Sequence, residues 1–163
     1  MSVVSKRIDR PIEDVFAALV TPVTYPSWLV GCKEIRAVDD GWPAVGTRFH
    51  HCVGVAGPVT VADSSRVEAI EAPHRLVLEV RARPVGRGQV TFTLEQQAPG
   101  SSTTLTVDEV PVGRLAVLRP LLAPLVMARN ERSLTRLEEH LTPAETHPGT
   151  RAGTHVKATP EGS

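Results

Sequence analysis

The stretch that decides the fold is residues 113–141, GRLAVLRPLLAPLVMARNERSLTRLEEHL. Counting back from its end, the residues that recur at intervals of four or three are Leu141, Leu137, Leu134, Asn130, Met127 and Ala123. This spacing is that of one face of an α-helix. The other face carries side chains that suit water, namely Arg132, Arg136, Glu138 and Glu139. Because Pro120 and Pro124 lie near the start, we expect the regular helix to begin at one of them or to kink there.

Asn130 interrupts the apolar face of this helix between Met127 and Leu134. A buried amide without partners costs about 1–3 kcal/mol. Either another buried polar group meets Asn130, or the helix faces something other than a solid core. The sequence therefore predicts a cavity beside the helix.

The chain before this helix predicts one strand, two short helices and six more strands. The expected strands are 2–8, 32–38, 46–55, 59–70, 75–82, 89–97 and 103–110, and the expected short helices are 12–20 and 21–29. Short connections between successive strands predict an antiparallel sheet. Ten residues of strand span roughly 33 Å, and the helix spans roughly 30–40 Å. A curved sheet could therefore wrap the helix.

Large side chains are scarce, with three Phe, one Tyr and two Trp in 163 residues. We expect Tyr25, Trp28 and Leu29 to close one end of the core. The rest of the space between sheet and helix lacks bulky residues to fill it, which agrees with the cavity indicated by Asn130. At 63–65 the apolar alternation lapses, which predicts a solvated bulge or a polar cavity wall.

The order of elements resembles the helix-grip fold of the START-like superfamily, also called the SRPBCC or polyketide cyclase/dehydrase group. The matching stretches are IDRPIEDVFAALVTPVTYPSW at 8–28, VGTRF at 45–49 and RNERSLTRLEEHL at 129–141. The resemblance covers residues 2–141. It implies an α+β fold in which a curved antiparallel sheet of about seven strands, with two short helices after the first strand, is covered by one long C-terminal helix over a hydrophobic cavity. The superfamily includes aromatase/cyclases, lipid and sterol carriers, hormone receptors and chaperone activators, so the fold alone does not fix an activity.

We predict a ligand-binding domain at residues 1–142 and a disordered tail at 143–163. The tail holds few large apolar residues and is rich in Pro, Thr, Gly and charge. Such a composition cannot offset the entropy lost on ordering.

Composition argues against several classes of function. Lys and Arg number 18, as do Asp and Glu, so the formal net charge is zero and gives no electrostatic case for binding nucleic acid or an anionic membrane. No run of about 18 apolar residues predicts a membrane-spanning helix, and the first residues lack the apolar centre of a secretory signal. We expect Cys32 and Cys52 to be reduced thiols in the cytoplasm, with a disulfide or redox pair as the alternatives.

The predicted ligand-binding residues are Trp28, His51, Glu109, Met127, Asn130 and Leu134. Strand alternation turns His51 and Glu109 inward, toward Asn130. These groups could orient a carbonyl or hydroxyl group and move a proton, because burial would raise the pKa of Glu109 and lower that of His51. The alternative is that they hydrogen-bond one another or reach water at the cavity mouth.

We predict no metal and no cofactor. His50, His51 and Cys52 suggest a metal site, but adjacent strand residues face opposite ways, so His50 and His51 cannot easily share one ion. The sequence contains no Gly-rich phosphate loop and no G-x-S-x-G motif. Arg114 and Arg119 could receive an anionic ligand group or be exposed to solvent.

Three function classes remain. The leading hypothesis is a cytoplasmic, single-domain protein that binds a small hydrophobic molecule, with a homodimer left open. The alternative is a polyketide cyclase/dehydrase-like enzyme that uses Glu109 or His51 as acid or base. The third is a partner-binding module with an apolar patch on the sheet, against which the outward positions of Arg48, Glu79, Arg81 and Glu95 argue.

Overall fold

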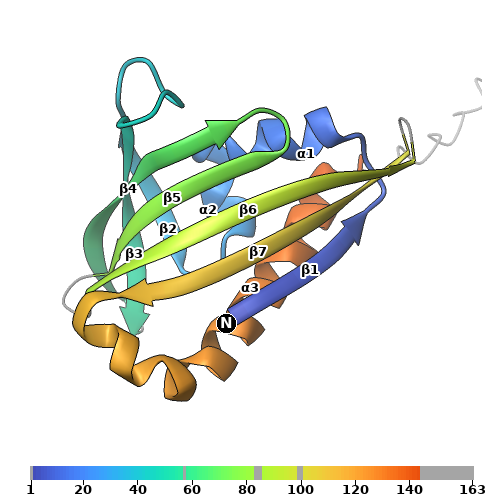
Figure 1. Ribbon diagram of the computed structural model, residues 1–163. Helices are drawn as coiled ribbons and strands as arrows, with labels where there is room; N and C mark the ends of the chain where they lie inside the picture. Colours follow the sequence, from blue (N-terminus) through green and yellow to red (C-terminus); the bar gives the residue numbers. More distant parts are fainter. Residues whose placement is uncertain (1, 57, 83–85, 99–100, 144–163) are drawn as a thin grey trace, which may run out of the picture.

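The computed structural model describes residues 2–56, 58–82, 86–98 and 101–143 (Figure 1). The elements in chain order are β1 (Ser2–Ile8), α1 (Ile12–Leu19), η1 (Pro22–Thr24), α2 (Tyr25–Trp28), β2 (Cys32–Val38), β3 (Arg48–Ala56), β4 (Val59–Glu71), β5 (Arg75–Ala82), β6 (Gly86–Ala98), β7 (Ser102–Val112), η2 (Gly113–Leu118) and α3 (Arg119–Leu141). Here η denotes a 3₁₀ helix.

Within the described residues, the strands form one seven-stranded sheet in the order β1-β7-β6-β5-β4-β3-β2. Every neighbouring pair is antiparallel, and the first strand joins the last, with Val4 opposite Val107. The three α-helices lie on one face of the curved sheet (Figure 1). The predicted α+β architecture, with two short helices after the first strand and one long C-terminal helix, is confirmed.

Helix α1 forms where an apolar stripe follows a favourable start. Pro11 precedes its first turn, and Glu13 and Asp14 lie in that turn, where the positive end of the helix dipole favours acidic side chains. The stripe that packs against the sheet is fully or largely buried and consists of Ile12, Val15, Phe16, Ala18 and Leu19. Burial of this stripe fixes α1 against the interior.

An aromatic cluster closes one end of the core, as expected for Tyr25 and Trp28. Both side chains are buried, and their rings contact edge to face with centroids 4.6 Å apart. Phe49 from β3 contacts Tyr25 at 5.1 Å and Trp42 at 5.2 Å. The Tyr25 hydroxyl donates to the carbonyl of Leu19 at 2.5 Å, so its polar end is satisfied inside the core.

Helix α3 covers the open face of the sheet and packs against β1, β7 and α2. It begins beside Pro120 and continues through Pro124. A proline has no amide hydrogen, so Pro124 removes one hydrogen bond from the helix interior. The second half of the helix is anchored by the buried side chains of Leu134 and Leu137.

The prediction of a bulge at residues 63–65 is wrong. Strand β4 pairs regularly with β3 there, with His51 opposite Asp63 and Phe49 opposite Ser65. The irregularity in β4 lies further along, between Val67 and Ala69 in its pairing with β5. The apolar alternation lapses at 63–65 because the inward positions are polar, and the strand itself stays regular.

The domain limit at residue 142 and the disordered tail at 143–163 stay predictions. The described residues end at 143, so residues 144–163 lie outside them.

Leu137→Ala tests whether α3 is held by its apolar face. The side chain is fully buried, so its truncation leaves a cavity and lowers the free energy of unfolding by about 2–5 kcal/mol. Urea unfolding followed by circular dichroism measures this loss. The matched control, Arg136→Ala, changes an exposed neighbour and is expected to shift stability by no more than about 0.5 kcal/mol. Equal effects of the two variants would contradict the packing described here.

Candidate functional site

A cavity of about 400 Å³ lies between the sheet and α3. Its walls are mostly apolar, and the apolar and aromatic side chains that line it include Tyr25, Trp28, Leu29, Phe49, Val53, Leu78, Val80, Val90, Phe92, Val107 and Leu134. Cavities of this size and character hold small organic molecules in many proteins. The interior is therefore hollow, as the scarcity of large side chains predicts.

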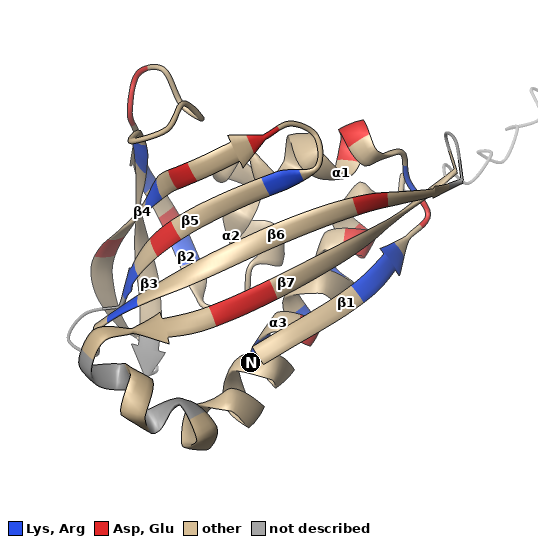
Figure 2. Ribbon diagram, in the orientation of Figure 1, with Lys and Arg blue, Asp and Glu red and all other residues tan. Residues whose placement is uncertain are grey.

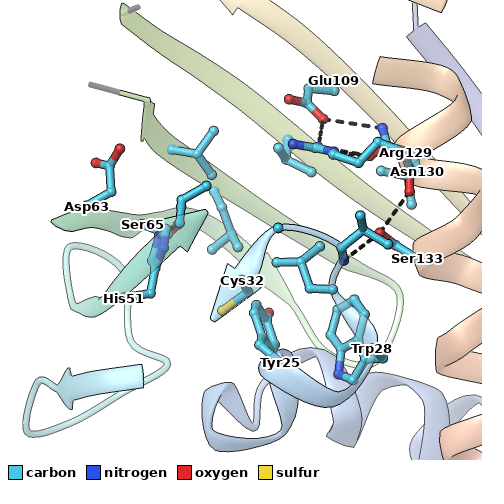
Figure 3. A pocket seen from close by; sticks show the side chains of 18 of the residues that line it. Tyr25, Trp28, Cys32, His51, Asp63, Ser65, Glu109, Arg129, Asn130 and Ser133 are labelled. Atoms are coloured by element: carbon cyan, nitrogen blue, oxygen red, sulfur yellow. Dashed lines mark hydrogen bonds and ion pairs between the residues drawn. The ribbon is translucent and has the colours of Figure 1, made fainter. Parts of the chain in front are cut away.

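The polar side chains of the cavity fall into two groups on different walls (Figure 3). The helix-side group consists of Glu109, Arg129, Asn130 and Ser133, and the strand-side group consists of His51, Asp63 and Ser65. The structure thus brings Glu109 together with Asn130, but it places His51 on a separate wall.

The helix-side group is a hydrogen-bonded cluster around the Glu109 carboxylate, whose side chain is 14% exposed. The Arg129 guanidinium forms an ion pair with Glu109 Oε2. The Asn130 amide donates to the same oxygen at 3.2 Å, and Asn130 Oδ1 accepts from Arg129 Nη2 at 2.9 Å. Asn130, which is 4% exposed, is thus satisfied by another buried polar group beside the cavity. Asn130 therefore meets a buried polar group and also lies beside a cavity, so both explanations offered for its position on an apolar helix face apply.

Ser133 connects this cluster to the loop between α2 and β2. Its hydroxyl donates to the carbonyl of Arg129 at 2.9 Å and accepts from the backbone N–H of Val30 at 3.1 Å. Val30 and Gly31 also line the cavity. One serine therefore fixes a loop that forms part of the cavity wall against α3.

The strand-side group centres on His51, which is 7% exposed. Its Nε2 lies 3.2 Å from the Ser65 hydroxyl, and its ring packs beside Phe49. Burial lowers the pKa of His51 below its usual value, and the neighbouring Asp63 carboxylate opposes that shift only in part. At neutral pH the imidazole is therefore uncharged. Its Nδ1 is buried and makes no hydrogen bond to any described residue.

Cys32 is a buried thiol on the cavity wall. Burial raises its pKa to about 11, so the group stays protonated at neutral pH and is a weak nucleophile. Both Cys32 and Cys52 are free thiols in the structure. This arrangement fits the reduced state expected from the sequence.

Five of the six predicted ligand-binding residues line the cavity, namely Trp28, His51, Glu109, Asn130 and Leu134. Met127 does not; it packs against the hydrophobic core. The cavity contacts the turns of α3 that contain residues 129–134, and Met127 precedes them on the same helix. Helix phase predicted its face correctly, but phase carries no information about how far along the helix the cavity extends.

Sequence reasoning missed Arg129 and Ser133. The signal was present, because these residues stand four apart and flank Asn130 and Leu134 on the helix surface. Asp63 and Ser65 were more readily assigned to a solvated bulge, but both line the cavity. Arg81, expected to point outward, also lines it. The side chains of Arg114 and Arg119 lie outside the part of the chain that the structure describes.

The proposed separation of the neighbouring histidines agrees with the geometry. His51 faces the cavity, while His50 lies near Asp39, with Nε2 3.4 Å from a carboxylate oxygen. Among the described residues, no group of three or more His, Cys, Asp or Glu side chains could hold a metal ion. None of the helices in the described ranges is long and apolar enough to cross a membrane.

A curved antiparallel sheet closed by one long helix around a cavity defines a helix-grip protein. The sequence profile of the family described as polyketide cyclase/dehydrase and lipid transport matches residues 2–142. The chain therefore belongs to this SRPBCC-type family, and the resemblance stated from the sequence is confirmed. A search of curated proteins gave no match.

Solved structures show the same fold at low sequence identity. A protein from Nitrosomonas europaea is 18% identical, with a TM-score of 0.65 over 85% of this chain and 92% of that chain. A Mesorhizobium loti protein is 22% identical, with a TM-score of 0.60 over 85% and 94%. The di-domain ARO/CYC BexL from the BE-7585A biosynthetic pathway is 12% identical, with a TM-score of 0.64 over 85% of this chain and 48% of that one.

Arg129→Met tests the ion pair at the cavity wall. The substitution leaves the largely buried Glu109 carboxylate without its charged partner, which is expected to lower the free energy of unfolding by about 1–3 kcal/mol. Chemical denaturation measures the loss, and Arg132→Met, an exposed arginine of the same helix, is the control. In the double variant with Glu109→Gln, we expect a loss smaller than the sum of the two single losses. Additive losses would mean that the two groups do not interact.

Proposed function

We propose that this protein binds a small hydrophobic molecule that carries at least one hydrogen-bonding group. The observation that supports this most is the cavity of about 400 Å³, with apolar walls and polar side chains on two sides. An apolar body would be stabilised by burial at about 25 cal/mol per Å². The polar groups would orient it, because an unpaired polar group in such a cavity is costly.

The two polar walls suit different parts of a ligand. On the helix side, the ion pair of Glu109 with Arg129 presents a donor and an acceptor with no net charge. On the strand side, the uncharged His51 and the Ser65 hydroxyl are neutral hydrogen-bonding groups that stand beside the Asp63 carboxylate. Carbonyl and hydroxyl groups match both walls, and we propose an uncharged ligand that carries such groups.

A polyketide cyclase/dehydrase-like enzyme is the second candidate. It is supported by the family to which the chain belongs and by the fold shared with the ARO/CYC protein BexL. His51 is the stronger candidate for a proton acceptor, because burial keeps it uncharged at neutral pH. Glu109 is the weaker one, because its Oε2 is already engaged by the Arg129 guanidinium and the Asn130 amide.

We also propose that the protein works in the cytoplasm. The two free thiols support this, since a reducing compartment preserves them. A homodimer stays a proposal.

Asn130→Leu tests the ligand-binding site. It removes a polar group from the cavity wall while keeping a helix-compatible side chain, so ligand uptake is expected to change and the fold to persist. Native mass spectrometry of the freshly purified protein identifies any bound molecule, and titration of that molecule compares the variants. Thr135→Leu, on the exposed face of the same helix, is the control. If Asn130→Leu only stabilises the protein and uptake is unchanged, the site assignment fails.

A pH profile tests the enzyme hypothesis on a poly-β-keto substrate. If His51 accepts a proton, activity is present above its lowered pKa and is lost as pH falls through that pKa, which places the acidic limb below pH 6.5. His51→Phe is expected to abolish the activity, and Glu109→Gln to reduce it. Unchanged activity in both variants would exclude acid–base catalysis by these residues.

A further inference from the structure

The beginning of α3, together with η2, carries an apolar surface that nothing in the described structure covers. Three side chains form it: Val117 is 81% exposed, Leu121 76% and Leu125 70%. Leu121 and Leu125 stand four residues apart in α3, so they lie on one side of that helix, and Val117 precedes them in η2. We refer to Val117, Leu121 and Leu125 as the exposed stripe.

The second half of the same helix presents a different surface to solvent. Its exposed side chains are polar or charged and include Glu131, Arg132, Thr135, Arg136 and Glu139. The change in character along a single helix shows that the exposed stripe is not a general property of this surface. Contiguous exposed apolar side chains of this kind mark interaction sites.

In the sequence, the charged residues that neighbour the exposed stripe all have one sign. No Asp or Glu occurs between Glu109 and Glu131, whereas Arg114 and Arg119 lie within the stretch that holds the stripe. Figure 2 shows no Asp or Glu among the described residues of η2 and of the first turns of α3. A chain whose formal net charge is zero therefore has a locally basic, apolar segment, which the composition of the whole chain conceals.

The exposed stripe is close in sequence to the part of α3 that lines the cavity. Arg129 follows Leu125 by four residues and lines the cavity, where it pairs with Glu109. Segment η2 and the start of α3 project beyond one end of the sheet (Figure 1).

We propose that the exposed stripe docks this protein on the surface of a lipid bilayer that contains anionic lipids. Helices that lie in the membrane interface combine apolar side chains on one face with nearby Lys or Arg residues. The stripe, the two arginines and the absence of acidic residues fit this pattern. A second copy of the chain fits less well, because three aliphatic side chains cover far less than the roughly 800 Å² per partner of a stable interface.

Vesicle flotation tests the docking surface with the full chain. We expect the protein to float with vesicles of phosphatidylcholine and phosphatidylglycerol, and the Leu121→Gln/Leu125→Gln variant to lose about tenfold or more of this binding. The matched control is Val23→Gln/Val45→Gln, which changes two valines that are 69% and 63% exposed elsewhere on the molecule. The control variant is expected to float as the original protein does. Unfolding midpoints show that both variants are folded.

Three results would overturn the proposal. The first is that the protein does not float with the vesicles. The second is that the Leu121→Gln/Leu125→Gln variant floats as well as the original protein. The third is that the original protein is a dimer, that this variant alone is a monomer, and that neither form binds vesicles. The last result would assign the stripe to self-association, and light scattering detects it. Arg114→Gln/Arg119→Gln is expected to weaken the preference for vesicles with phosphatidylglycerol over vesicles of phosphatidylcholine alone. An unchanged preference would show that Arg114 and Arg119 do not contribute to the binding of anionic lipids.

Discussion

The ion pair of Glu109 with Arg129, reinforced by Asn130, joins β7 to α3 where apolar contact between sheet and helix gives way to a cavity. An isolated carboxylate in this place would be strongly destabilised by the loss of water. Its pairing lets the sheet and the helix remain together beside a hollow interior. The buried side chains of Leu134, at the cavity wall, and of Leu137 complete the attachment.

The proposed ligand-binding function rests on the cavity. Its apolar walls would stabilise many molecules almost equally, so selection among them depends on the few polar groups. Those groups divide between an ion pair on the helix side and an uncharged imidazole, a hydroxyl and the Asp63 carboxylate on the strand side. This division favours ligands with polar groups on an apolar framework over simple hydrocarbons.

The strands, the helices and their inward faces could be predicted from the sequence because they follow from periodicity. Alternation placed His51 and Glu109 inward, and helix phase placed Asn130 and Leu134. Helix spacing places Arg129 beside Asn130, but it does not predict the ion pair with Glu109, because that pair depends on where the end of a long side chain reaches. The polar wall at Asp63 and Ser65 resembles a solvated bulge in sequence, since both place polar residues where the alternation expects apolar ones.

Pro124 affects the local stability of α3. It removes the backbone hydrogen bond that position 124 would otherwise donate to the carbonyl of Pro120, within the turns that carry the exposed stripe. The first turns of α3 are therefore held by one hydrogen bond fewer than a regular helix would have. The amides before Pro124 can exchange their hydrogens through local fraying at low free-energy cost, whereas those near Leu134 and Leu137 require unfolding of the core.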